Sequence, residues 1–324
     1  MSRTNGTTQT NPIVRIVAAA ALTAATAIAL LALAGCGTTT ASSPTPAPAP
    51  TAAAFPVTIT DDASNTVTIK VEPQRIVSLA PANTEIAFAL GLGDKVVGVT
   101  TFDDYPAAVK TIAKVGDFTT PNLEAIAAAK PDLILATTGV QADVVKKLEA
   151  LGATVIAIDP QNLDGVYTDI GRVGQATGTA DKAAAVVDGM KSDVTDVQNA
   201  VQGLPSVTTF VEIGQNPLFT VGSGTLIDEL IKLADGTNVV TQHGYVGYST
   251  EQLIKADPQV YLATKGSSSD PSAIAKRAGF SALSAVKNNR IVILDDNLVS
   301  RPGPRIVEGL KQIAAALHPE AFTK

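Results

Sequence analysis

Short apolar runs alternate along the chain with longer segments in which apolar residues recur every three or four positions. The runs at residues 75–79, 133–135 and 260–262 are typical of buried parallel strands. Helical spacing is clearest at residues 179–202, where Ala, Val and Met fall on one face. Because strand and helix alternate throughout, the pattern predicts an α/β fold with mainly parallel sheets.

One segment of the chain occurs twice. Residues 122–137 read NLEAIAAAKPDLILAT and align without a gap with residues 249–264, STEQLIKADPQVYLAT. In each copy a cap candidate opens a helical run, a proline ends it, and a short apolar run follows. Each copy also places one glutamate, Glu124 or Glu251, on the first turn of its helix. The duplication predicts two related α/β lobes, each with one glutamate at an equivalent corner.

The segment between the two lobes is a single predicted helix. Residues 179–202 would form a helix about 36 Å long at 1.5 Å per residue, and Gly203 and Pro205 end it. One long helix predicts a stiff pair of lobes, whereas a Gly/Ser linker would predict a freely hinged pair. The predicted divisions are a first lobe at 55–178, a linking helix at 179–203 and a second lobe at 204–324.

Polar and glycine-containing stretches mark the expected turns within each lobe. In the first lobe we expect a hairpin at 55–71, a tight loop at 80–84 before a helix at 85–90, strands at 96–99 and 154–158, and a helix at 142–151. In the second lobe we expect strands at 207–213 and 291–294, loops at 214–219 and 295–304, and helices at 226–234 and 305–317.

Residues 1–36 have the pattern of an export signal. Two arginines accompany an almost wholly apolar run at 16–34, and the only cysteine, Cys36, follows in Leu-Ala-Gly-Cys. This resembles the bacterial lipobox, which implies cleavage before Cys36 and attachment of lipid to it. The alternative is a plain membrane-spanning helix. Residues 37–54, rich in Thr, Pro and Ala, predict a disordered or extended tether that would hold an extracytoplasmic protein near a membrane.

Composition excludes several classes of function. The formal net charge is −6 and no basic tract occurs, so nucleic-acid binding is not expected. Two histidines and one cysteine are too few for a structural zinc site, and we expect no metal site and no cofactor. No GxSxG or HExxH motif occurs, and a Ser-His-Asp triad has no support, so we do not expect an enzyme.

Three features have an ordinary structural explanation beside a functional one. Glu124 and Glu251 would each stabilise a helix dipole by about 0.3–1 kcal/mol, but their equivalent positions favour a docking role. Residues 222–225, Gly-Ser-Gly-Thr before a helix, are either a phosphate loop or a helix cap. His243 is either a metal or haem ligand or a surface histidine without that role.

The loops that follow the predicted strands are the candidate binding site, because ligands of open α/β sheets bind beyond the carboxyl ends of the strands. Most of the few aromatic residues outside the export signal fall in these loops. The candidates are Asn83, Phe102, Tyr105 and Phe118 in the first lobe, and Asn216, Phe219, Tyr245 and Arg301 in the second. Together they predict a cleft with flat apolar faces and few charges.

Five segments occur in order: RIVSLAPANTEIAFALG, GVTTFDDYP, NLEAIAAAKPDLILAT, GQNPLFTVGSG and STEQLIKADPQVYLAT. Together they resemble the substrate-binding proteins of ABC importers, in the class that carries cobalamin, ferric siderophores and haem. The resemblance covers residues 55–324 and implies two α/β lobes joined by one long helix, with the ligand between them and only slight opening. It also implies that Glu124 and Glu251 pair with arginines of a permease dimer.

The segments PANTEIAF, FDDYP and Asn-Pro-x-Phe-Thr look most like those of the vitamin B12 binders. That similarity implies a corrin site lined by Phe102, Phe118, Phe219, Tyr245 and Arg301. A tris-catecholate siderophore would need several basic partners, whereas a large and nearly neutral ligand such as cobalamin suits aromatic walls. Neutral ferric hydroxamate complexes and haem remain the alternative ligands.

The sequence thus predicts an extracytoplasmic, lipid-anchored binding protein without catalytic activity. Its expected partners are an ABC importer permease dimer, cobalamin or a ferric siderophore, and a membrane reached through the lipid. One alternative is a secreted metal-dependent enzyme on the same scaffold, which would need a cluster of His, Asp and Glu. Another is an adhesion or sensor module, against which the paired glutamates and the apolar cleft argue.

Overall fold

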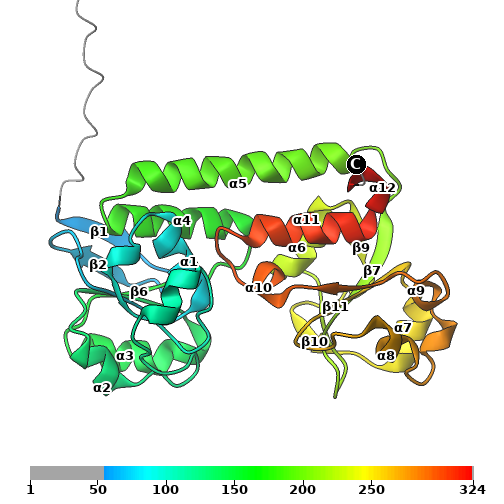
Figure 1. The fold of residues 1–324 in the computed structure, drawn as a ribbon, viewed down its shortest axis with the longest axis horizontal. Helices are drawn as coiled ribbons and strands as arrows, with labels where there is room; N and C mark the ends of the chain where they lie inside the picture. The colour runs from blue at the N-terminus through cyan, green and yellow to red at the C-terminus, as the bar shows by residue number, and fades with distance from the viewer. Residues whose placement is uncertain (1–54, 323–324) are drawn as a thin grey trace, which may run out of the picture. The chain divides into compact units, whose positions relative to one another are not determined.

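The computed structural model describes residues 55–322, and these form two α/β lobes (Figure 1). The sheet of the first lobe has four strands in the order β4-β3-β5-β6, and every neighbouring pair is parallel. These strands are β3 (Ile76–Ser78), β4 (Val96–Gly98), β5 (Leu133–Ala136) and β6 (Val155–Ala157). Both faces of the sheet are covered, which is why β3, β5 and β6 read as continuous apolar runs.

The first lobe surrounds its sheet with helices and begins with a separate hairpin. β1 (Val57–Thr60) and β2 (Thr66–Ile69) pair antiparallel, as the alternating pattern predicts. The α-helices are α1 (Pro81–Ala89), α2 (Leu123–Ala128), α3 (Ala142–Ala150) and α4 (Leu163–Ala176). Three short 3₁₀ helices complete the lobe, η1 (Gly93–Lys95), η2 (Ala107–Thr111) and η3 (Gly139–Gln141).

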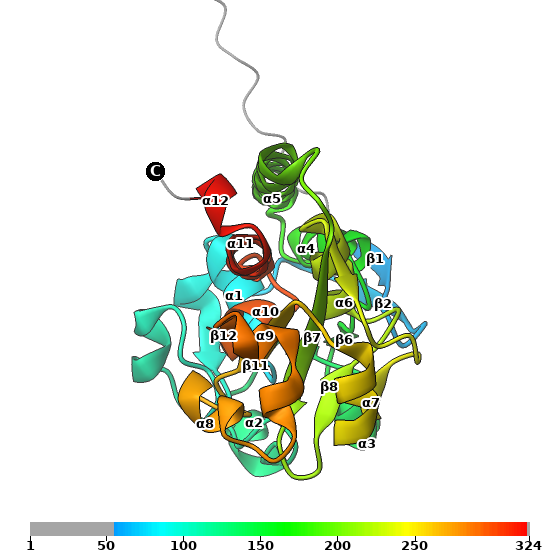
Figure 2. The same cartoon turned by 90° about the vertical axis from the view of Figure 1, so that its right-hand side faces the viewer.

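A single long helix, α5 (Ala180–Val201), connects the lobes with 22 residues. Its buried side chains, Ala183, Met190, Val197 and Val201, recur at helical spacing and face α4 and α11 (Ile306–Leu317). Figures 1 and 2 show α5 lying over α4 and α11 along one side of both lobes. In both views α2 and α7 (Thr250–Ala256) lie away from α5, on the other side of the lobes.

The sheet of the second lobe is mixed. Its strand order is β10-β8-β7-β11-β12, with β9 added alongside β7. The pairs β7–β9, β7–β11 and β11–β12 are parallel, whereas β8 and β10 run antiparallel to their neighbours. The strands are β7 (Val207–Gly214), β8 (Phe219–Val221), β9 (Gly236–Asn238), β10 (Tyr245–Gly247), β11 (Val260–Thr264) and β12 (Ile291–Leu294).

The helices of the second lobe are mostly short. Besides α7 and α11 they are α6 (Leu226–Leu233), α8 (Pro271–Ala275), η4 (Phe280–Ala282), α9 (Ser284–Lys287), α10 (Asp296–Val299) and α12 (Pro319–Phe322). Within residues 55–322, no helix combines the length and the apolar character needed to cross a bilayer.

The duplicated segment has the same local structure in both lobes. The Asn122 side chain accepts a hydrogen bond from the Ala125 N–H at 3.0 Å, and Ser249 forms a capping box with Gln252. The residues before the two prolines, Lys130 and Asp257, both have positive φ, 48° and 41°. This left-handed conformation ends each helix and directs the chain into β5 or β11. The predicted equivalence of the two segments is therefore confirmed.

Three sequence-based expectations are wrong in detail. Residues 81–84 are not a loop, because Pro81 is the first residue of α1, where its fixed φ suits a helix and no N–H is needed. The expected loop at 295–304 contains the short helix α10, capped by the side chain of Asp295. Phe219 and Tyr245 do not lie in loops as expected, because they are the first residues of β8 and β10, respectively.

One large cluster of buried apolar residues extends through both lobes. It runs from Ile76 and Leu135 in the first sheet, through Met190 of α5, to Leu262 and Leu310 in the second lobe. Smaller clusters fill the outer faces of the two sheets, around Ile134 and around Phe210, respectively. Because the lobes share a core across α4, α5 and α11, burial of apolar surface holds them together on that side.

Candidate functional site

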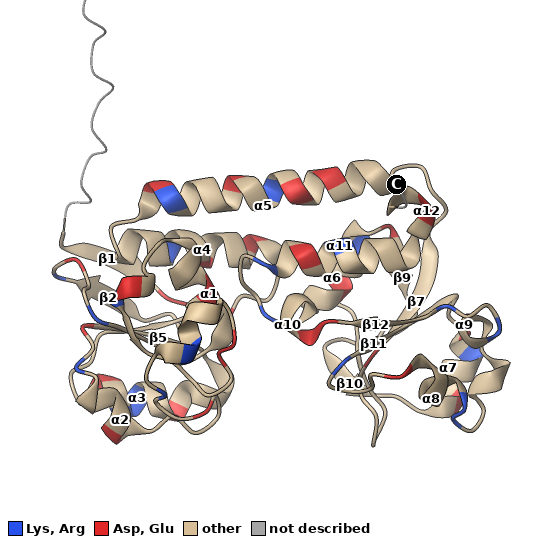
Figure 3. Cartoon of the chain, in the orientation of Figure 1, with Lys and Arg blue, Asp and Glu red and all other residues tan. Residues whose placement is uncertain are grey.

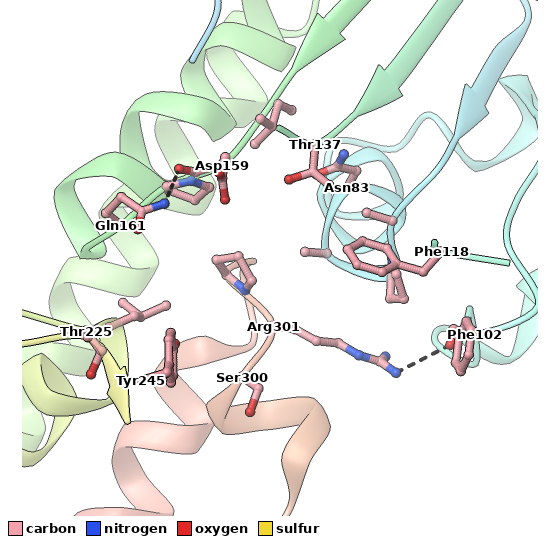
Figure 4. A pocket seen from close by; sticks show the side chains of 18 of the residues that line it. Asn83, Phe102, Phe118, Thr137, Asp159, Gln161, Thr225, Tyr245, Ser300 and Arg301 are labelled. Carbon is pink, nitrogen blue, oxygen red and sulfur yellow. Dashed lines mark hydrogen bonds between the residues drawn. The ribbon is translucent and has the colours of Figure 1, made fainter. Parts of the chain in front are cut away.

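A cleft of about 590 Å³ lies between the two lobes. Residues of the first lobe that line it include Asn83, Phe102, Phe118, Thr137, Asp159 and Gln161. Those of the second lobe include Thr225, His243, Tyr245, Ser300 and Arg301. Figure 4 shows these two sets facing one another across the open space, although His243 is not labelled there.

The sheet topology explains why these residues meet. Asn83, Phe102, Thr137 and Asp159 follow β3, β4, β5 and β6, respectively, and all four strands are parallel. The carboxyl ends of parallel strands share one edge of a sheet, so the segment after each strand reaches the cleft. After β3 this segment is the first turn of α1, which carries Asn83. In the second lobe, the turn after β8 supplies Thr225, and the start of β10 supplies Tyr245.

Three aromatic rings give the cleft its apolar character. Phe102 and Tyr245 are 59% and 55% exposed, and Phe118 is half-buried. Figure 4 places Phe102 and Phe118 on the first-lobe side and Tyr245 opposite them. Exposed rings that face one another across a cleft provide apolar surface that a bound ligand would remove from water. The arrangement suits a large ligand with flat apolar faces.

Hydrogen bonds fix the loops that carry these residues. The buried Gln141 side chain donates to the carbonyls of Leu79 and Phe118, both at 2.7 Å. It thereby ties the Phe118 loop to the end of the first sheet. The buried Asn83 amide donates to the Ala136 carbonyl at 2.9 Å, and this bond locks its orientation at the start of α1. The first-lobe wall is thus held in place before a ligand arrives.

Tyr245 is an uncharged polar group at neutral pH. Partial burial against the cleft walls and, second, the nearby Asp159 carboxylate raise the pKa of Tyr245 above its usual value. The phenol therefore keeps its proton and offers a ring face and a hydrogen-bond donor. Asp159 accepts a hydrogen bond from the Thr138 hydroxyl, and its N–H donates to Asp62 at 2.7 Å.

Glu85, Asp104, Arg301 and Arg305 form an interlobe charge cluster at the edge of the cleft. Glu85 Oε1 accepts from Arg305 Nη2 at 2.6 Å and Arg301 Nη1 at 3.1 Å, and Oε2 accepts from Arg305 Nε at 2.9 Å. Asp104 Oδ1 accepts from Arg301 Nη1 at 2.6 Å. The Arg305 guanidinium stacks on the Tyr105 ring, with its Cζ atom 3.9 Å from the centroid of that ring. Both arginines are therefore already paired with carboxylates.

The structure brings together five of the eight predicted ligand residues. Asn83, Phe102, Phe118, Tyr245 and Arg301 line the cleft, and Tyr105, Asn216 and Phe219 are not among its lining residues. Tyr105 instead packs on Arg305, and Asn216 is exposed in the turn between β7 and β8. Phe219, 38% exposed, pairs with Gly247 in the antiparallel strands.

Both candidate docking residues are on the surface. Glu124 and Glu251 are exposed on the first turns of α2 and α7, the helices that lie away from α5. Neither residue lines the cleft. Cys36 falls outside the described residues, as do the predicted export signal and tether.

Several residues of the cleft did not emerge from the sequence. Thr137 lies two residues after the predicted strand at 133–135, and Asp159 directly follows the one at 154–158. The rule that sites lie beyond strand ends could therefore have found both. Glu85 gave no comparable signal, because its partners are more than 200 residues away. His243 lines the cleft, but no three His, Cys, Asp or Glu residues of the described chain are placed to hold a metal ion.

Comparison with known proteins agrees with this architecture. Residues 76–298 match the model of a family described as periplasmic binding protein. The chain belongs to the periplasmic binding protein family. The membership expected from the five sequence segments is confirmed.

Three relatives have informative names. The chain is 40% identical over 277 residues to Bacillus subtilis YvrC, described as an uncharacterized ABC transporter substrate-binding lipoprotein, covering 83% of this chain and 87% of that protein. It is 31% identical to a cobalamin-binding protein of Halobacterium salinarum, covering 82% and 74%. A crystal structure from Staphylococcus epidermidis, described as a possible iron-binding (periplasmic solute-binding) protein, matches with a TM-score of 0.70 and 36% identity, covering 76% and 100%.

Proposed function

We propose that this chain is an extracytoplasmic, lipid-anchored substrate-binding protein that delivers cobalamin or a related corrinoid to an ABC importer. The observation that carries the proposal is the cleft between the lobes, with Phe102, Phe118 and Tyr245 on its walls. The names of the Bacillus and Halobacterium relatives support both the importer partner and the corrinoid ligand.

The charges of the cleft favour a nearly neutral ligand. Arg301 is the one Arg or Lys residue among those that line it, and that side chain is bonded to Glu85 and Asp104. A tris-catecholate ferric complex carries several negative charges and needs several free cationic partners. Cobalamin presents a large, flat and nearly neutral surface, which aromatic walls accommodate without charge pairing.

The docking role of Glu124 and Glu251 is part of the proposal. The two glutamates occupy equivalent positions on α2 and α7, exposed and outside the cleft. Charge pairs at the edge of an interface steer and orient partners more than they add affinity. We propose that one glutamate from each lobe pairs with arginines of the permease dimer.

The location of the protein rests on its first 36 residues. An export signal that ends in Leu-Ala-Gly-Cys would place a lipid on Cys36, and residues 37–54 would act as the tether. The relative YvrC is described as a lipoprotein, which supports this anchor. Figure 3 shows acidic and basic residues interspersed over the described elements, with no run of basic residues that would favour nucleic acid.

Ferric hydroxamates and haem are the second candidates. His243 lines the cleft and is exposed, so its imidazole is available to haem iron. The iron-binding description of the Staphylococcus structure favours a ferric complex. Because the chain belongs to a family of binding proteins, we do not favour the alternative that it is a secreted metal-dependent enzyme.

Titration calorimetry of the purified protein tests the proposal. We expect saturable binding of cyanocobalamin at one site per chain, tighter than binding of a neutral ferric hydroxamate or of haemin. Tight binding of the hydroxamate or of haemin, with no heat from cyanocobalamin, would overturn the choice of ligand and leave the importer role intact. Absence of binding for all three ligands would contradict the assignment of the cleft.

A further inference from the structure

The interlobe charge cluster contains as many carboxylates as guanidinium groups. Glu85 and Asp104 come from the first lobe, and Arg301 and Arg305 come from the second. The four formal charges therefore cancel. Arg301 also lines the cleft, so whatever balances its charge helps to determine the electrostatic potential that a ligand meets.

The two carboxylates of the cluster are not equivalent. The Glu85 side chain is 2% exposed and bonds both arginines. The Asp104 side chain is 51% exposed, bonds one of the two arginines, Arg301, and accepts a second hydrogen bond from the neutral Asn297 amide at 3.0 Å. Water screens the exposed carboxylate much more than the buried one. The hydrogen bonds that Arg305 donates to Glu85 are the main reason that the pKa of Arg305 is raised. Glu85 is thus the principal counter-charge.

A buried guanidinium group without its counter-ion would strongly attract an anion. The side chains of Arg301 and Arg305 are 15% and 17% exposed, so solvent screens them only in part. With Glu85 in place, their donors are directed at carboxylate oxygens and an incoming anion would have to displace these bonds. Without the Glu85 charge, the cluster would carry one net positive charge at the edge of the cleft.

We propose that Glu85 is a specificity-determining residue, which cancels the charge of Arg301 and Arg305 and so makes the cleft discriminate against anionic ligands. This inference rests on the proposed function, because it treats the cleft as the ligand site. It adds that the preference for neutral ligands depends on a buried carboxylate, in addition to the aromatic walls.

The same cluster also joins the two lobes, and that structural role must be separated from selectivity. If Glu85 only holds the lobes together, its loss weakens every ligand alike. If Glu85 sets the charge of the cleft, its loss strengthens anionic ligands relative to neutral ones of the same shape. The ratio of two affinities therefore distinguishes the two roles, whereas a single affinity does not.

The chain offers a matched control for the loss of a buried carboxylate. Glu212 is fully buried in the second lobe, where its Oε1 accepts from Arg277 Nη2 at 3.1 Å. Neither Glu212 nor Arg277 lines the cleft. Glu212→Gln removes the same charge from the same kind of pair as Glu85→Gln, and both substitutions preserve the shape of the side chain. Only Glu85→Gln should alter ligand selectivity.

Two ligands that differ by one charge provide the test. Cyanocobalamin and its monocarboxylate, in which one side-chain amide is hydrolysed to a carboxylate, have nearly the same shape. We expect the wild-type protein to bind cyanocobalamin at least tenfold more tightly, and Glu85→Gln to reduce this preference by about tenfold. Glu212→Gln should keep the wild-type ratio. In case Glu85→Gln fails to fold, Asp104→Asn should shift the ratio in the same direction, but less.

The affinity measurements test the role of Glu85 and the choice of a corrinoid ligand separately. Equal affinity of the wild-type protein for both corrinoids, or an unchanged ratio in Glu85→Gln and Asp104→Asn, would overturn the role of Glu85 and leave the proposed function standing. If neither corrinoid binds the wild-type protein, the corrinoid assignment fails. The ratio is then measured with a neutral ferric hydroxamate and a trianionic ferric tris-catecholate. Tight binding of the tris-catecholate to the wild-type protein would overturn the inference.

Discussion

Glu85 and Arg305 are joined by two hydrogen bonds, 2.9 Å to Nε and 2.6 Å to Nη2, although 220 positions separate them in the chain. The carboxylate belongs to α1 of the first lobe, and the guanidinium directly precedes α11 of the second. The lobes are therefore connected in two ways. The shared apolar core beneath α5 is one connection, and this polar contact at the edge of the cleft is the other.

Glu85→Ala should destabilise the folded protein strongly. The substitution leaves two mostly buried guanidinium groups short of a counter-charge, and breaking a buried pair costs about 3–5 kcal/mol. Asp188→Ala, an exposed acid on α5, serves as the control and should change stability by less than about 0.5 kcal/mol. Urea unfolding measures both. Equal stability of the two variants would show that the pair contributes little.

Replacement of both Glu124 and Glu251 by alanine should impair uptake and leave ligand affinity unchanged. The two side chains are exposed and do not line the cleft, so their loss removes charges from the proposed permease interface alone. The matched control is replacement of both Asp188 and Asp196 by alanine. These two exposed acids lie on α5, on the side of the lobes away from α2 and α7. Uptake of labelled ligand and calorimetry are measured for both variants. A loss of ligand affinity in the first variant would mean that these glutamates act at the cleft.

Cys36→Ala should prevent lipid attachment and leave the protein unprocessed or released. The prediction follows from the position of the only cysteine after an apolar run and small residues. Intact-mass analysis of membrane-extracted protein is the measurement. A mature wild-type protein that begins at any residue other than Cys36 would contradict the lipid anchor.

Stability should decrease as pH rises towards neutrality, and Asp169 should be one cause. Desolvation and, second, the charge of Asp62 raise the pKa of Asp169 from 3.8 to about 7. Because the folded state binds this proton more tightly than the unfolded state, its contribution to stability is largest below the unfolded pKa and is lost as pH rises through the folded value.

Asp169→Asn cannot ionise and should remove that part of the pH dependence. Thermal unfolding at pH 5 and pH 8 is the measurement, with exposed Asp188→Asn as the control. The melting temperature of the control should decrease between the two pH values as it does in the wild-type protein, and that of Asp169→Asn should decrease less. An identical decrease in all three proteins would show that Asp169 does not titrate in this range.

Local signals made much of the fold predictable from the sequence. The duplicated segments could be assigned because caps, prolines and short apolar runs act over a few residues, as Asn122 and Ser249 show. The prediction of a loop at 80–84 is wrong because proline suits both a loop and the first position of a helix, where Pro81 lies. The strands that contain Phe219 and Tyr245 could not be predicted from the sequence, because each has only three residues and depends on pairing with a strand elsewhere in the chain.

The sequence predicts the residues of the candidate site that lie in segments after strands, and it predicts long-range side-chain contacts poorly. The candidates Phe102, Phe118 and Tyr245 line the cleft, whereas the candidate Tyr105 packs on Arg305 and does not line it. The partners of Arg301 could not be predicted, because no local pattern marks a carboxylate more than 190 residues away as its counter-charge.

The most direct test of the account is the affinity for cyanocobalamin of four single alanine variants, compared with the wild-type protein by calorimetry. Phe118→Ala and Tyr245→Ala remove rings that line the cleft, and each should weaken binding by about 1–3 kcal/mol. Phe219→Ala and Tyr105→Ala remove matched rings that do not line it, and each should change the affinity by less than about 0.5 kcal/mol. Equal losses in all four variants, or losses only in the second pair, would contradict a ligand held between the aromatic walls.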